Sequence, residues 1–403
     1  MKSLPYDGGD EPDEHALAGR QVFGKIAGRM KQMSYASEFE RLIIQSNELP
    51  PGKVCVELIE QAIRIADVHL TVQEQFVGRT ELIRACFRSG IPRPMLAALT
   101  WCLAAIDRNE IQPHQIEFDV ALWQCKHAVT WIPNFNSITY EQFEALLADV
   151  LKRYSAAGAS PRAVYQIAAG SELSMGHPDR AVELSELGQK CVRDRFSESH
   201  AWELYFDIEL LFYFDRAEEA LEKLEPIWEN PARAEGVFNH FVTAALFPLL
   251  ECGQEQFAGK LCARIVPSVV GNLRYLDSVS QAIAFYACIG ESTSALSIID
   301  RTLMAGLVAH SEADRLFFSH AVSLAMKRLQ NEGRSEVTLK IPADSIESAM
   351  PEGIPVSSSG VVATARLESW LSRYFTPDLD KFNLRNGNQY VSSLLEKRAR
   401  LMR

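Results

Sequence analysis

The sequence contains no long apolar stretch and no leader-like beginning. Its longest mostly apolar run, FVTAALFPLL from Phe241, covers ten residues, about half of the roughly 20 that a membrane-spanning helix needs. The opening stretch, MKSLPYDGGDEPDEH, carries five acidic side chains and no apolar segment of the kind found in a secretory signal. These absences predict a cytoplasmic protein that makes no use of a membrane.

Basic residues are scarce relative to acidic ones. The 403 residues include 41 Lys and Arg against 52 Asp and Glu, a formal net charge of −11. Because binding to a phosphate backbone requires a basic surface, this balance argues against nucleic acid as a partner. A local exception is the C-terminal stretch QYVSSLLEKRARLMR, which has Lys397, Arg398, Arg400 and Arg403 against Glu396. We interpret its positive charge as a complement to the helix dipole.

Metal-binding patterns are missing as well. The eight cysteines include no CxxC pair, and the nine histidines never stand three or four residues apart, the spacing that places two ligands on one helical face. The nearest approach to a cluster is His310 and His320 with Glu312 and Asp314 between them, which we interpret as a solvated helix start. Most cysteines stand beside apolar residues, which predicts buried, reduced thiols: Cys55, Cys86, Cys102, Cys125, Cys191, Cys252, Cys262 and Cys288.

No catalytic signature is found either. The sequence lacks GxxxxGK[ST], a GxGxxG motif after a strand, and GxSxG. Cys125, Lys126 and His127 are adjacent in a helical stretch, where neighbouring side chains point about 100° apart, so they cannot act as nucleophile and base. We interpret them as one core thiol beside two partly exposed polar groups. The sequence predicts that the protein is no enzyme and has no cofactor.

From residue 15 to 332 the sequence contains a series of stretches in which apolar residues recur at helical spacing, and no convincing β pattern. Four turn residues are each followed five positions later by an alanine: Gly176 by Ala181, Phe212 by Ala217, Gly253 by Ala258, and Gly290 by Ala295. Gly90 is followed at the same distance by Met95. The alanines are 36, 41 and 37 residues apart. This period is typical of two-helix repeats, in which the glycine provides a positive φ and the small residue permits close helix contact.

The chain divides into four parts on this basis. Residues 1–14 are an acidic lead that we expect to be disordered, 15–332 form the helical array, 333–360 are a linker, and 361–403 are a C-terminal helical segment. The linker contains one candidate strand, Val337–Ile341. In the last part we predict a helix over 361–374, a turn at Asn386-Gly387, and a final basic helix.

The repeats resemble tetratricopeptide repeats. Tyr165, Ala169 and Gly176 stand where that consensus has an aromatic, a small residue and a glycine; departures in other units are Phe212, Leu246 and Ile283. Over roughly 50–395, LTWCLAAID, ALWQCKHAVTWIPNFNSITYEQFEALLADVLKRYSAAG and FNLRNGN are similar to a group of bacterial tetratricopeptide-type proteins of unassigned function, common in actinobacteria. The resemblance implies an all-α superhelix, a right-handed solenoid of five to seven helix pairs with a C-terminal helical appendage. It implies no activity and transfers no site residues.

Function is therefore predicted from the architecture. In stacked pairs the first helices line the concave face, and two of them carry candidate partner-binding residues: Trp202, Tyr205, Phe206, Asn239, His240, Thr243 and Phe247. We predict a non-catalytic scaffold or adaptor that binds a peptide or partner protein there; these rings could instead pack between repeats. Alternatives are a regulatory sensor that changes shape on binding a peptide or small effector, and an enzyme with an unrecognised pocket. The scaffold prediction rests on hairpins packed in series; strands at the centre of the molecule, or a compact globule whose distant segments touch, would remove its basis.

Overall fold

The computed structural model describes residues 33–111, 116–234, 236–339, 351–356 and 359–402, and the protein is all-α. Residues 33–48 form a first helix. The others are α2 (Lys53–His69), α3 (Val72–Ser89), α4 (Pro92–Asp107), α5 (Ile116–Trp131), α6 (Tyr140–Ala156), α7 (Arg162–Ser174), α8 (Pro178–Lys190), α9 (His200–Tyr213), α10 (Ala217–Glu229), α11 (Phe238–Glu251), α12 (Glu255–Val269), α13 (Leu276–Cys288), α14 (Ser292–Leu307), α15 (Glu312–Asn331), α17 (Thr364–Asn386) and α18 (Tyr390–Arg400). Short 3-10 turns are η1 (Ile132–Asn134), η2 (Pro231–Ala234) and η3 (Leu273–Tyr275). None of the helices in these ranges is both long and apolar enough to span a bilayer.

Local signals set many of the helix ends. The predicted capping box at the start of α6 is confirmed: the Thr139 hydroxyl accepts from the Gln142 N–H at 3.2 Å, and the Gln142 side chain accepts from the Thr139 N–H at 2.9 Å. Pro92 and Pro178 stand in the first turns of α4 and α8, where a missing N–H leaves no bond unmade.

The corners between paired helices share one backbone conformation. Gly90, Gly176, Gly253 and Gly290 all have a positive φ, between 65° and 81°, and each stands two residues before the second helix of its pair. The alanine five positions after three of these glycines is buried: Ala181 after Gly176, Ala258 after Gly253, and Ala295 after Gly290. The signature therefore has the physical basis expected from the sequence.

One repeat is aligned differently in the structure. Between α9 and α10 the positive-φ residue is Asp215, at 55°, and the buried small residue five positions later is Ala220. The sequence alignment had placed Phe212 and Ala217 there, three residues too early, because aspartate can adopt the left-handed conformation without being glycine. With Ala220 in place, the small residues are 39, 38 and 37 residues apart.

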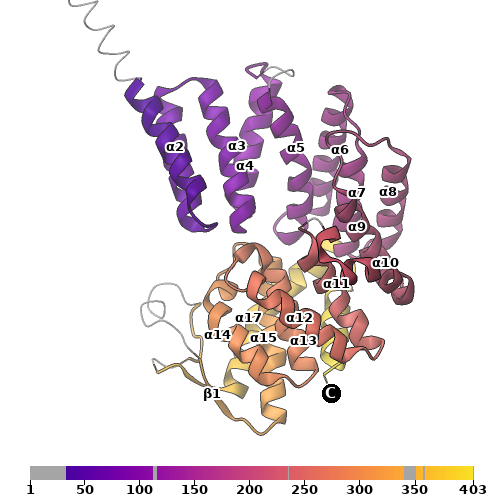
Figure 1. Cartoon of the computed structure of the whole chain (residues 1–403). Coiled ribbons are helices and arrows are strands. Elements are labelled where there is room, and N and C mark those ends of the chain that lie inside the picture. Colours follow the sequence, from indigo (N-terminus) through magenta and orange to yellow (C-terminus); the bar gives the residue numbers. More distant parts are fainter. Residues whose placement is uncertain (1–32, 112–115, 235, 340–350, 357–358, 403) are drawn as a thin grey trace, which may run out of the picture.

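The helices pack in chain order. Each of α5, α7, α9, α11 and α13 contacts the next odd-numbered helix as well as its own partner. Figure 1 shows α2 to α8 following one another across one tier, with α11 to α15 in a second tier below. Two large apolar clusters fill these tiers, one from Val56 to Phe196 and one from Ala201 to Leu371.

Segments far apart in the sequence also touch, which packing in series alone does not give. The Arg93 guanidinium lies 2.5 Å from a Glu312 carboxylate oxygen. Gly90 lies against the backbone of Leu273, so close that a Cβ at Gly90 would be 2.7 Å from the Leu273 carbonyl carbon. The α3–α4 corner therefore meets η3 and the start of α15. Distant segments touch there, which corrects the expectation of packing in series alone, while the successive contacts of the odd-numbered helices remain.

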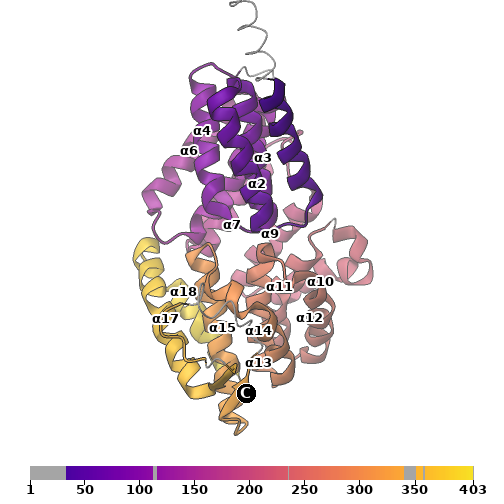
Figure 2. The ribbon, with the colours of Figure 1, turned by 90° about the vertical axis from the view of Figure 1, so that its left-hand side faces the viewer.

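The C-terminal segment is part of this packing. Strand β1 (Glu336–Thr338), inside the predicted linker, pairs antiparallel with β2 (Val361–Ala363), which opens the predicted C-terminal segment, and Val337 stands opposite Val362. The helix predicted over 361–374 starts later, because its first three residues pair with β1, and it continues through Pro377 to Asn386. Figure 2 shows α17 and α18 beside α15, and α17 packs along α15. The predicted acidic lead at 1–14 lies outside the described residues.

Candidate functional site

Four of the seven predicted partner-binding residues form one aromatic cluster between α9 and α11. The Trp202 ring centroid lies 5.6 Å from that of Tyr205, 6.2 Å from that of Phe206 and 4.9 Å from that of His240. All four side chains are half-buried. Phe206 also packs against Gly170 of α7. The rings thus join successive first helices, and they keep part of their surface exposed.

The other three predicted residues point elsewhere. Thr243 is 3% exposed; its hydroxyl donates to the Asn239 carbonyl at 2.7 Å and lies 3.0 Å from the Ser278 hydroxyl. The Asn239 side-chain oxygen accepts from Ser268 on α12. Phe247 lies one helical turn further along α11 and contacts α18. The seven residues therefore do not form one surface.

The final helix, α18, covers a surface made by α7, α9, α11, α13 and α15, which we call the inner face. Val391 and Leu395 of α18 are buried in a cluster with Leu316 of α15. The Lys397 ammonium lies 2.9 Å from a Glu251 carboxylate oxygen on α11. The sequence placed this helix in a separate C-terminal segment, and the structure places it against helices that lie 70 to 230 residues earlier.

The stretch FNLRNGN, one of the landmarks behind the family resemblance, forms the corner that holds α18 there. The Asn388 amide donates to the Met175 carbonyl at 2.9 Å, and the Asn388 side-chain oxygen accepts the Tyr390 N–H at 3.0 Å. Arg385 donates to the carbonyls of Pro133 and Phe135 at 2.9 and 3.1 Å. These bonds fasten the α17–α18 corner to η1 and to the α7–α8 turn.

His177 adds a charged link to the same corner. Its Nδ1 lies 2.8 Å from a Glu172 carboxylate oxygen and its Nε2 lies 2.8 Å from the Asn386 carbonyl. Both partners are acceptors, so the doubly protonated ring suits the site, and the hydrogen bond to Glu172 raises the pKa of His177.

A cavity of about 730 Å³ remains between α18 and the inner face. Its lining is mixed: beside apolar side chains it includes the charged groups of Glu209, Asp215, Glu251, Asp277, Arg385, Lys397 and Arg398. The Glu209 carboxylate accepts a hydrogen bond from the Tyr205 hydroxyl at 2.5 Å and forms no ion pair within the described chain. Burial, with the nearby charge of Asp277, raises the pKa of Glu209 to about 7.

Arg398 is the most unusual of these groups. It is 8% exposed, and across the described residues its guanidinium has no hydrogen-bond or ion-pair partner. The group lies between two rings, 5.0 Å from the Phe247 centroid and 5.7 Å from the Phe317 centroid. Burial lowers the pKa of Arg398 to about 10.

Replacing Glu209 by glutamine is expected to stabilise the protein at pH 8 by about 2 kcal/mol and to have little effect at pH 4. The folded pKa of about 7 lies above the ordinary 4.5, so the wild type loses stability as pH rises from 4.5 to 7, and glutamine has no charge to bury. Urea unfolding at both pH values measures the difference. The exposed Glu222→Gln is the control, and equal shifts in both variants would contradict the prediction.

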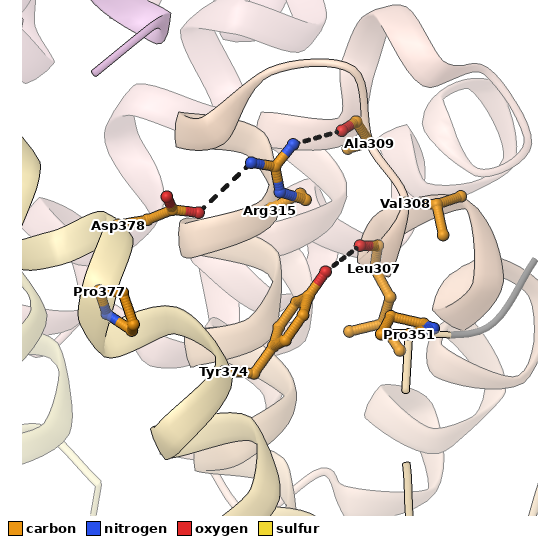
Figure 3. A pocket seen from close by; sticks show the side chains of 8 residues that line it. All are labelled: Leu307, Val308, Ala309, Arg315, Pro351, Tyr374, Pro377 and Asp378. Atoms are coloured by element: carbon orange, nitrogen blue, oxygen red, sulfur yellow. Dashed lines mark hydrogen bonds and ion pairs between the residues drawn. The ribbon is translucent and has the colours of Figure 1, made fainter. Parts of the chain in front are cut away.

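A second pocket, of about 430 Å³, lies where α17 meets the α14–α15 loop (Figure 3). Its polar groups bond to one another: Arg315 donates to the Ala309 carbonyl at 3.0 Å and lies 3.4 Å from Asp378, and the Tyr374 hydroxyl donates to the Leu307 carbonyl at 2.8 Å. These contacts join α17 to α15 and to the α14–α15 loop, and they give the polar groups of the pocket partners within the protein.

In the triplet Cys125-Lys126-His127, the buried thiol and the half-buried His127 agree with their interpretation, and Lys126 does not. Lys126 is fully buried, and its ammonium lies 2.7 Å from a Glu198 carboxylate oxygen. His127 packs on Phe87 at 4.8 Å, and burial lowers its pKa to about 3. The sequence does not indicate the burial of Lys126, because its partner, Glu198, lies on a different stretch of the chain.

The His310 to His320 segment also differs from expectation. His320 is 8% exposed rather than solvated, and burial lowers its pKa to about 3. Within the described ranges, no three His, Cys, Asp or Glu side chains come together as a metal site would require. All eight cysteines are free; six are buried as expected, Cys191 is partly buried and Cys252 is exposed.

Sequence reasoning did not single out Glu209, Asp277 or Arg398 as site residues. A signal for Arg398 was present: Val391, Leu395 and Arg398 are four and three residues apart, which places the arginine on the apolar face of the last helix. Glu209 and Asp277 have no such signal in the sequence.

A scan against protein-family models finds no match to the chain, and a search of curated proteins finds none either.

Proposed function

We propose that the protein is a tetratricopeptide-like solenoid whose concave inner face binds a helical segment, and that it serves as a non-catalytic scaffold. The observation that carries this proposal is the position of α18, a helix from the far end of the chain that lies on the first helices of several pairs. A surface that holds one amphipathic helix has the shape and chemistry to hold another.

The contacts of α18 define the partner. It presents Val391 and Leu395, four residues apart, to apolar side chains, and it presents Lys397 to Glu251. A partner helix with aliphatic residues at this spacing and a basic residue on the flank of its apolar face would make the same contacts. In the intact chain it must compete with α18, which is linked to the site and has a high effective concentration there.

Releasing α18 is expected to open the inner face. The full-length double variant Val391→Glu, Leu395→Glu places two charges in an apolar cluster, which favours undocking of the helix. We expect it to bind a fluorescent peptide of residues 388–403 at least tenfold more tightly than the wild type does. Fluorescence anisotropy measures the affinity.

The matched control is Arg400→Glu, a charge change on the exposed side of the same helix, where the side chain is 79% exposed. It should bind the peptide as weakly as the wild type. Circular dichroism shows whether the double variant keeps its helices. A folded variant that does not bind the peptide would show that the inner face is not a helix-binding surface.

A sensor function is a second candidate, because α18 and the inner face line a cavity in which Arg398 Nε has no partner among the described residues. A small molecule in this cavity would touch both sides and so would hold α18 in place.

A further inference from the structure

We propose that the cavity between α18 and the inner face binds a small zwitterion, such as an amino acid or short peptide, with its carboxylate on Arg398 and its ammonium near Glu209 and Asp277. This site shares part of its lining, including Val391 and Lys397, with the surface that α18 covers in the proposed function. A different ligand tests it.

The first argument is the isolated guanidinium. A buried arginine without a hydrogen bond bears a desolvation cost that an ion pair would normally offset. Arg398 is 8% exposed, and Nε is buried without a partner. Phe247 and Phe317 hold the group in place from two sides, which leaves the edges of the planar fork for a ligand. A carboxylate that accepts two parallel N–H bonds fits that fork.

The second argument is the pair of carboxylates in the same cavity. The half-buried Glu209 accepts only the Tyr205 hydroxyl among the described residues, and Asp277, which lines the same cavity, is exposed. Glu209, Asp277 and Arg398 all line this cavity. A half-buried carboxylate that forms no ion pair among the described residues favours an ammonium beside it.

The third argument is size and enclosure. About 730 Å³ is within the range of small-molecule sites in proteins. The remaining wall includes Phe212, Phe247 and Leu316, which suit an apolar side chain. Since Arg398 is on α18 while Glu209 and Asp277 are on α9 and α13, the ligand would join α18 to the inner face.

Binding is tested on the full-length protein with the twenty free amino acids and a panel of dipeptides. Differential scanning fluorimetry identifies binders and calorimetry measures their affinity. We expect at least one zwitterion to bind saturably. Its N-acetylated form, which lacks the ammonium, and its C-amidated form, which lacks the carboxylate, should each bind at least tenfold more weakly.

The variant Arg398→Gln should weaken binding of that zwitterion at least tenfold and affect the amidated form much less. Arg400→Gln, on the exposed side of α18, is the control and should bind like the wild type. Because Arg398→Gln could disturb α18, Glu209→Gln provides a second variant, which should weaken the zwitterion and spare the N-acetylated form.

Several results would overturn the proposal. They are no binding by any free amino acid or dipeptide, equal binding of the capped forms, or an unchanged affinity in both Arg398→Gln and Glu209→Gln. Saturable binding of Mg²⁺ or Ca²⁺ that Glu209→Gln abolishes, without any zwitterion binding, would assign the carboxylates to a cation instead. None of these results depends on whether the 388–403 peptide binds the inner face.

Discussion

Replacing Glu198 by alanine is expected to lower the free energy of unfolding by about 3–5 kcal/mol, because it leaves a buried ammonium without its counter-charge. Lys126 is 0% exposed, its Nζ lies 2.7 Å from Glu198 Oε1, and it donates to the Phe196 carbonyl at 3.0 Å. Burial already lowers the pKa of Lys126, which shows how poorly the site tolerates the bare charge. Urea unfolding monitored by circular dichroism measures the loss.

The double variant Lys126→Met, Glu198→Ala is the matched control. It removes both charges and keeps an unbranched apolar side chain over the Trp123 ring, whose centroid lies 3.3 Å from Lys126 Nζ. It should recover most of the stability that Glu198→Ala loses, since replacing a whole buried pair by apolar groups is often neutral. A double variant no more stable than Glu198→Ala would assign the loss to packing at residue 198.

Replacing Gly176 by alanine is expected to lower stability by about 3 kcal/mol and to loosen α18. Two effects combine: about 1 kcal/mol for a Cβ at a φ of 80°, and about 2 kcal/mol for overpacking. A Cβ there would collide with Tyr390 Cβ and would lie 2.9 Å from the Asn388 side-chain oxygen. Hydrogen exchange of residues 388–400 should quicken at least tenfold.

Gly253→Ala separates the two effects. Gly253 has the same place in its hairpin and a φ of 74°, but a Cβ there would have no atom within 4 Å. It should therefore cost only the backbone term, about 1 kcal/mol, and leave exchange in α18 unchanged. Equal effects at the two glycines would mean that α18 is not seated on the α7–α8 corner.

The hairpin corners show how far sequence reasoning reached. Gly176, Gly253 and Gly290 were identified because glycine is the residue that a positive φ selects. Asp215 was missed because it has the same conformation, at 55°, without the same identity. The buried Ala220 that follows it was missed with it. A positive φ occurs at this corner as at the others, but the glycine that usually indicates it is absent.

The candidate site was less accessible to prediction. Trp202, Tyr205 and Phe206 were identified because their spacing places them on one helical face, and the structure brings them together with His240. Thr243 was selected on the same ground, but it is buried against Ser278 on α13. Helical spacing gives the direction of a side chain relative to its own helix, and it does not say which helix stands opposite.

The sequence by itself determined the helices, their capping residues and most of their corners, because these depend on residues within about one turn of one another. Only the tertiary structure decided that α18 lies on the inner face, that Lys126 meets Glu198, and that Glu209, Asp277 and Arg398 share one cavity. Small rotations between successive hairpins accumulate over many units. The position of the last helix therefore depends on the sum of these rotations, and no local sequence pattern predicts that sum.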